Sequence, residues 1–301
     1  MISIEDWREN AGGHEDSLDR FLAACAASQG RCGFGGADPE AAFDSLLARL
    51  DRESVPSSDP DDPRTLSGDN VRFVFEIALL DRNSWPWLAV GLSQAEAGDG
   101  STFLSFFDSF DGTEDAARDD FQTAVLAVDQ KYRRGPIHDY FALADRSYDE
   151  FNRFWYLSGY WDLVHALWQV EDRDAFRGRI RNPVTAAPIL LIGMTHDPAT
   201  PYVQAQRLAA DLGNARLLTF DADGHGAVST FDPCVLGALV EYLNEGILPP
   251  KDSVCVQQGE PFPSPGLRAT ERPEWKPAEP AVPQTALRSP PQAAVSRRPA
   301  P

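Results

Sequence analysis

The sequence has few positive charges for its length and no long apolar segment. It contains 27 Lys and Arg residues against 46 Asp and Glu residues, and lysine is rare beside arginine. A net charge of -19 repels nucleic-acid phosphates and anionic lipid surfaces, so we expect neither nucleic acid nor membrane as a partner. No uninterrupted apolar run approaches the roughly 20 residues that span a bilayer.

Cysteine is also scarce, and its spacing does not match common metal or redox motifs. The four cysteines form two local couples, Cys25 with Cys32 and Cys234 with Cys255. Neither couple has C-x-x-C spacing, so we expect no metal and no cofactor. Three disulfide pairings are possible, and we favour the two local ones, which would require an oxidising compartment. The first residues, MISIEDW, lack the basic and apolar regions of a signal peptide, so this chain as given would be cytoplasmic.

Chemistry-bearing residues follow two apolar segments in the last third of the chain. The run PILLIG (residues 188–193) is typical of a strand buried on both faces of a parallel sheet, and Asp197 lies just after it. Thr200 before Pro201 predicts a helix start with a hydroxyl cap, and Gly213 predicts its end.

The second segment, ARLLTF (residues 215–220), predicts the next strand, and His225 follows it between two glycines. A right-handed crossover would place the ends of both strands side by side. Adjacent strands lie roughly 4.8 Å apart, so Asp197 and His225 could come within hydrogen-bond reach as the acid and base of a catalytic triad. A solvated turn and a surface histidine are the alternative interpretation.

These motifs carry a family resemblance. GMTHDPATPY, LLTFDADGHGAVSTFDPCV and EYLNEGILPPKDSVC resemble the carboxyl-terminal region of tripeptidyl-aminopeptidase-like α/β-hydrolases. WRENAGG, FLAACAASQGRCGFGG and VEDRDAFRGRIRNP are similar to the segment between nucleophile and acid in that family, largely its helical cap. By this resemblance Asp197 matches the triad acid, His225 matches the triad base, and Cys234 and Cys255 match a cysteine pair around the last helix.

The chain departs from the family in one motif. Ser nucleophiles of α/β-hydrolases occupy a G-x-S-x-G elbow, and the printed sequence contains none. We therefore expect an α/β chain with a partial α/β-hydrolase fold, in which a helical cap precedes the last strands and helices of the parallel sheet. A truncated gene product and one part of a split hydrolase are both compatible with this pattern.

Three segments are expected along the chain. Residues 1–180 would form the mainly helical cap, with helices at 14–28, from Asp38, at 69–80 and at 86–97, and with a Phe cluster after them. Residues 181–256 would form the TAP-like α/β segment. Residues 257–301 contain eleven prolines and few large apolar residues, which predicts a disordered tail.

The resemblance implies a serine hydrolase, a peptidase releasing short peptides or residues from free amino termini, with small esters as accessible substrates. The expected partners are a peptide or small ester substrate and a complementary amino-terminal hydrolase half that supplies the nucleophile. The family and the cysteines favour a secreted or cell-surface location. A non-catalytic peptide-binding module, a pseudohydrolase, is the alternative function.

Overall fold

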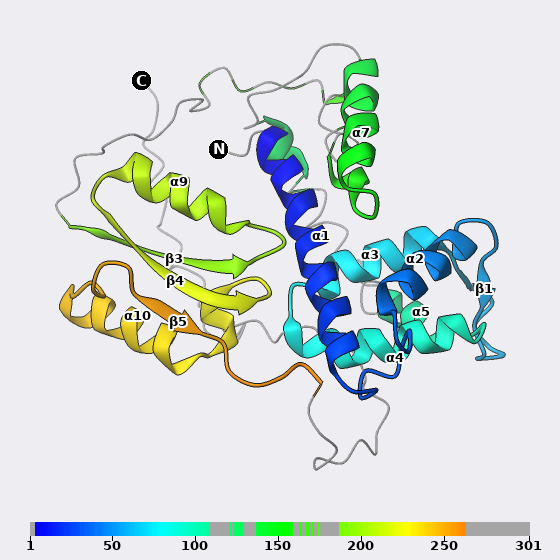
Figure 1. Ribbon diagram of the computed structural model, residues 1–301. Coiled ribbons are helices and arrows are strands. Elements are labelled where there is room, and N and C mark those ends of the chain that lie inside the picture. The colour runs from blue at the N-terminus through cyan, green and yellow to red at the C-terminus, as the bar shows by residue number, and fades with distance from the viewer. Residues whose placement is uncertain are drawn as a thin grey trace, which may run out of the picture.

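The computed structural model describes residues 4–108, 121, 123–128, 137–158 and 187–262, together with a few positions between 163 and 174. Within them a helical region precedes a small parallel sheet with its own helices (Figure 1). The helices of the first region are α1 (Ile4–Ala27), α2 (Pro39–Leu50), α3 (Gly68–Ala78), α4 (Trp85–Glu96), α5 (Ser101–Phe107) and α7 (His138–Glu150). Between them lie the 3-10 helices η1 (Arg82–Ser84) and η3 (Trp155–Leu157) and an antiparallel pair, β1 (Val55–Pro56) with β2 (Thr65–Leu66).

Local capping explains where α2 and α3 begin. Asp38 accepts a hydrogen bond from the backbone N–H of Ala41 at 3.1 Å, and proline fills the first helical position. Ser67 and Asn70 satisfy each other's backbone N–H groups in a capping box. Both helices therefore begin within about a residue of their predicted starts, whereas α1 extends well upstream of the expected residue 14.

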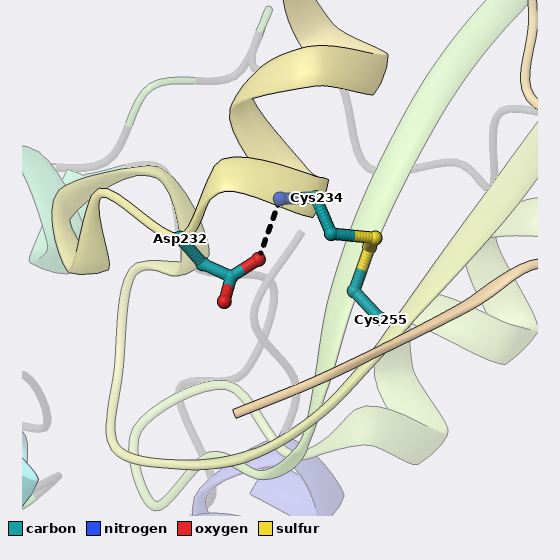
Figure 2. Close-up of side chains that lie close together, drawn as sticks. All are labelled: Asp232, Cys234 and Cys255. Atoms are coloured by element: carbon teal, nitrogen blue, oxygen red, sulfur yellow. Dashed lines mark hydrogen bonds between the residues drawn. A yellow bond between two sulfur atoms is a disulfide. The ribbon is translucent and has the colours of Figure 1, made fainter. Parts of the chain in front are cut away.

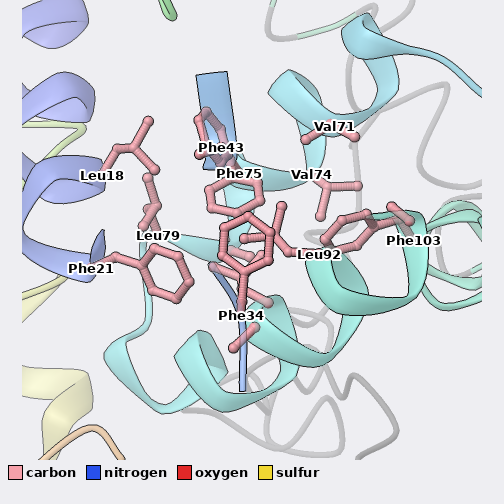
Figure 3. Close-up of a cluster of buried hydrophobic side chains, with 14 of the residues drawn as sticks. Leu18, Phe21, Phe34, Phe43, Val71, Val74, Phe75, Leu79, Leu92 and Phe103 are labelled. Atoms are coloured by element: carbon pink, nitrogen blue, oxygen red, sulfur yellow. The ribbon is translucent and has the colours of Figure 1, made fainter. Parts of the chain in front are cut away.

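Aromatic side chains fill the core of the helical region. Figure 3 shows Phe21, Phe43, Phe75 and Phe103 pointing toward one another from different helices. Their rings meet edge to face, with centroids 5.7 Å apart for Phe21 and Phe75 and 5.2 Å apart for Phe43 and Phe75. The Phe cluster after α4 comprises residues 103, 106, 107 and 110: Phe103 and Phe106 are fully buried in this core, and residue 110 lies outside the described residues.

The α/β part consists of β3 (Ile189–His196), α9 (Tyr202–Leu212), β4 (Ala215–Asp223), η4 (Ala227–Thr230), α10 (Pro233–Glu245) and β5 (Val254–Val256). The sheet order is β3-β4-β5, and both strand pairs are parallel. The fold class predicted from the sequence is confirmed, because helices precede a parallel α/β segment. The third strand, β5, was not predicted: it has only three residues, too few for a pattern to show.

Helix α1 stands between the two parts. In Figure 1 the arrowheads of β3 and β4 point toward α1, and α2 to α5 lie on its other side. The ends of the strands that precede Asp197 and His225 therefore face a helix from the other end of the sequence.

The chain stays packed past residue 257, where the tail was expected to begin. Phe262 is buried against Phe21, with ring centroids 6.1 Å apart, and Arg31 donates to the Phe262 carbonyl oxygen at 2.9 Å. Apolar burial and a backbone acceptor order these residues despite their polar composition. Residues 263–301, the rest of the predicted tail, lie outside the described residues. Among the helices that the structure describes, none is long and apolar enough to cross a membrane.

Candidate active site

Asp197 follows β3 directly and lies almost wholly buried, 5% exposed. Donors from the next turn fix its carboxylate. The N–H groups of Ala199 and Thr200 donate to Oδ1 at 3.0 and 2.8 Å, and the Thr200 hydroxyl donates to Oδ2 at 2.9 Å. A buried carboxylate with three local donors keeps one orientation.

His225 follows β4 in a loop that only glycine flanks could form. Gly224 has φ +115° and Gly226 has φ +79°, both in the left-handed region that side chains avoid. The imidazole Nδ1 lies 2.9 Å from each carboxylate oxygen of Asp197. The structure thus brings the two predicted site residues within hydrogen-bond distance, while their catalytic role stays a prediction.

The electrostatics of the pair favour one tautomer. An ionised carboxylate only accepts, so Nδ1 of His225 carries the proton and Nε2 presents its lone pair. The hydrogen bond that His225 donates to Asp197 raises the pKa of His225 above its ordinary value, and burial of the ring opposes the rise. The His225 side chain remains 40% exposed, and within the described part of the chain its Nε2 makes no hydrogen bond. The ring is oriented at one nitrogen and accessible for proton transfer at the other.

Thr200 has a different role from the one predicted. The sequence indicates a hydroxyl cap for the helix, but α9 has Pro201 at its N-cap and no side-chain cap bond. The Thr200 hydroxyl instead donates to Asp197 and lies 3.3 Å from Nδ1 of His225. Its spacing of three residues after the acid is the only signal that the sequence offered for this contact.

A pocket of about 320 Å³ opens beside the pair. Asp197, Thr200 and His225 line one end of it, and apolar residues of β3 and α9, among them Leu191 and Leu208, line the rest. Such a mixture of an apolar wall and a few convergent polar groups is typical of sites for small molecules.

Sequence reasoning missed a buried histidine near the pair. His14, on α1, is 5% exposed, and its ring nitrogens lie 2.8 Å from the Asn10 carbonyl oxygen and 3.2 Å from that of Glu76. Burial lowers the pKa of His14, and the charges of the Asp197–His225 pair act on it as well. A lone histidine inside a helical pattern gave no sign of this proximity.

The cysteines form the two disulfides favoured by their spacing, Cys25–Cys32 and Cys234–Cys255. Figure 2 shows the second, with Asp232 beside it. The Asp232 carboxylate accepts from the N–H of Cys234 at 2.9 Å and caps α10. This is the one metal-like grouping of His, Cys, Asp and Glu side chains among the described residues. Because both sulfurs are bonded to each other, neither can bind a metal as a thiolate.

Three acidic residues of the helical region, Glu96, Asp99 and Asp108, lie away from the pocket. Asp99 accepts from Ser58 and Ser101, and Asp108 pairs with Arg64 at 2.6 Å. Glu96 is exposed at the end of α4. None of them lines the pocket beside His225.

A buried acid after one parallel strand and a histidine after the next is the order found in α/β-hydrolases. Residues 154–255 match the family model Abhydrolase_4, described as TAP-like protein. The matched residues therefore carry a TAP-like Abhydrolase_4 domain within the carboxyl-terminal half of this chain.

Comparison with curated proteins agrees with this assignment. Serine protease Hip1 of Mycobacterium tuberculosis is 29% identical over 273 residues, which cover 84% of this chain and 50% of the relative. Carboxylesterase B of the same species is 29% identical over 266 residues, covering 84% and 49%. Tripeptidyl aminopeptidase of Streptomyces lividans is 28% identical over 103 residues, covering 34% and 19%. The chain spans about half the length of the first two, and it is a distant homologue of hydrolases of serine protease and esterase type.

Proposed function

We propose that this chain provides the cap and the acid–base pair of a serine peptidase that releases short peptides or residues from free amino termini. The observation that carries the proposal is the bond between Nδ1 of His225 and the buried carboxylate of Asp197, with the other ring nitrogen accessible at a pocket. The tripeptidyl aminopeptidase among its relatives supports the choice of substrate. The acidic net charge would also attract a positively charged amino terminus.

In this reaction His225 acts twice. Its Nε2 takes the proton of a serine hydroxyl as the oxygen attacks the carbonyl carbon, and the tetrahedral intermediate then collapses. The imidazolium returns the proton to the leaving amine, and the cycle repeats with water to release the acyl group. Asp197 stabilises the imidazolium and maintains the ring orientation.

The serine would come from a segment that the printed sequence does not include, on the same polypeptide or on another. Two features of β3 are consistent with a further segment that packs beside it. Among the described residues no strand pairs with the outer edge of β3, and the apolar residues 189–192 are only half-buried. Parallel strands are normally covered on both faces by the helices that connect them, so further strands at this edge, with their connecting helices, would complete the sheet and its cover.

The test uses chromogenic tripeptidyl and aminoacyl anilides. We expect turnover when the chain is joined to, or co-expressed with, an amino-terminal hydrolase half that carries a G-x-S-x-G serine, and at least about a hundredfold loss of kcat/KM in His225→Ala. A fluorophosphonate probe should label the serine of the assembled protein. An assembled protein that the probe does not label, and that binds peptides equally well after His225→Ala, would make it a non-catalytic binding module.

An esterase is the second candidate, because relatives named carboxylesterase B match over the same length of this chain. The same acid–base chemistry cleaves esters. Comparison of kcat/KM for p-nitrophenyl esters and for peptide anilides in the assembled protein decides between the two functions.

A further inference from the structure

The loops that carry Asp197 and His225 both contact α1, and they do so along a single face of that helix. Gly13, Asp16, Ser17 and Arg20 follow the i, i+3, i+4, i+7 spacing of residues that share one side of a helix. All four meet the carboxyl ends of β3 and β4. Figure 1 shows these strand ends directed at α1.

Gly13, Asp16 and Ser17 contact the loop that carries Asp197. A side chain at position 13 would lie only 2.8 Å from the Pro198 carbonyl oxygen, so only glycine allows this approach. Asp16 accepts from Nδ1 of His196 at 2.8 Å, and the Ser17 hydroxyl donates to the His196 carbonyl oxygen at 3.4 Å. Both residues next to Asp197 along the chain, His196 and Pro198, thus contact α1.

The loop that carries His225 is held to the helical region by ion pairs of Asp223. This carboxylate is 8% exposed, lies two residues before His225, and bonds to the Arg20 guanidinium. Arg82 approaches from the other side, with Nε 3.7 Å from Oδ2. The same guanidinium donates to Gln257 Oε1 at 2.7 Å, and that oxygen also accepts the Asp223 N–H at 3.1 Å. A buried carboxylate between two cations is costly to disturb, because removing one partner leaves an uncompensated charge.

Backbone hydrogen bonds also join the loop of His225 to the helical region. The N–H of His225 donates to the Leu80 carbonyl oxygen at 2.8 Å, and Gly224 forms an antiparallel bridge with Asp81. The turn before η1 therefore holds the backbone of His225 itself, through a hydrogen bond to its N–H group. Residues 13–20 and 80–82 all lie outside the stretch that matches the TAP-like family model.

We propose that Arg20 and Arg82 are positioning residues for His225, acting through Asp223, so that the helical region sets the alignment of the acid–base pair. Only the expected effect on kcat rests on the proposed hydrolase function. The hydrogen bond between His225 and Asp197 exists in this chain without any nucleophile, so its alignment can be measured independently of turnover.

The experiment compares Arg82→Gln with Arg72→Gln in the full chain. The two arginines are equally buried, with side chains 15% and 14% exposed, and both pair with aspartate, but Arg72 bonds to Asp51 and Asp69 in the helical region. Proton NMR of chains labelled with 15N in histidine follows the downfield Nδ1–H signal of His225. Thermal unfolding of each variant establishes that it folds.

We expect the signal to broaden or disappear in Arg82→Gln, to return in part in Arg82→Lys, and to stay unchanged in Arg72→Gln. In the assembled hydrolase, kcat should fall at least about tenfold in Arg82→Gln with little change in KM, since a misplaced base affects the chemical step. An unchanged His225 signal in a folded Arg82→Gln chain would overturn the proposal. A changed signal in a protein with no turnover would support positioning and reject the hydrolase function instead.

Discussion

Glu76 has a buried carboxyl group whose ionisation should oppose folding. The residue lies on α3 and is 9% exposed, and the Tyr156 hydroxyl donates to its Oε2 at 2.8 Å. Burial raises the pKa of Glu76 from 4.5 to about 7, and the bond from Tyr156 opposes the rise. Burial raises the pKa of Tyr156 as well, and the neighbouring Glu76 adds to the rise.

The direction of the pH effect follows from proton binding. Between pH 4.5 and 7 the folded chain keeps the proton of Glu76 while the unfolded chain loses it, so stability decreases as pH rises through this window. One pKa unit is worth about 1.4 kcal/mol, and the whole shift therefore amounts to about 3 kcal/mol at pH 8.

Replacement of Glu76 by Gln removes the charge and keeps both the shape and an acceptor for Tyr156. We expect Glu76→Gln to unfold like the wild type below pH 4.5 and to be about 3 kcal/mol more stable at pH 8. Urea unfolding followed by circular dichroism from pH 4 to pH 8 measures this. Glu96→Gln, at an exposed position, is the matched control and should leave the pH profile unchanged. Parallel profiles for wild type and Glu76→Gln would refute the reasoning.

Three further predictions concern the sheet and its loops. Cys234→Ser opens a disulfide that spans 21 residues and should lower the free energy of unfolding by about 3 kcal/mol, measured by urea unfolding; an unchanged midpoint would contradict it. Gly224→Ala should cost more stability than Gly98→Ala, because both have positive φ but only the first would meet a backbone oxygen, at 2.9 Å; equal thermal midpoints would argue against this. In the assembled hydrolase, Asp197→Asn should lower the pKa of His225, so the acidic limb of kcat/KM against pH moves to lower pH; a limb that stays in place would exclude His225 as the base.

Local sequence was sufficient for the order of elements around the candidate site. An apolar run, Asp197, a helix ended by glycine, a second apolar run and His225 predicted β3, α9 and β4, and α9 ends at Leu212, before Gly213, as expected. This succeeded because parallel strands joined by a helix must bring their carboxyl ends to one edge of the sheet. The geometry of the acid and base is a consequence of that rule.

Contacts between distant segments were decided only by the tertiary structure. The ion pairs of Arg20 and Arg82 with Asp223 join residues far apart along the chain, and no local pattern distinguishes these two arginines from the others. The Thr200 hydroxyl could have capped α9 equally well on local grounds; the buried carboxylate of Asp197 was the acceptor that it bonded. Hydrogen-bond partners of this kind depend on which surfaces meet after folding, whereas periodicity reports only which face of an element is apolar.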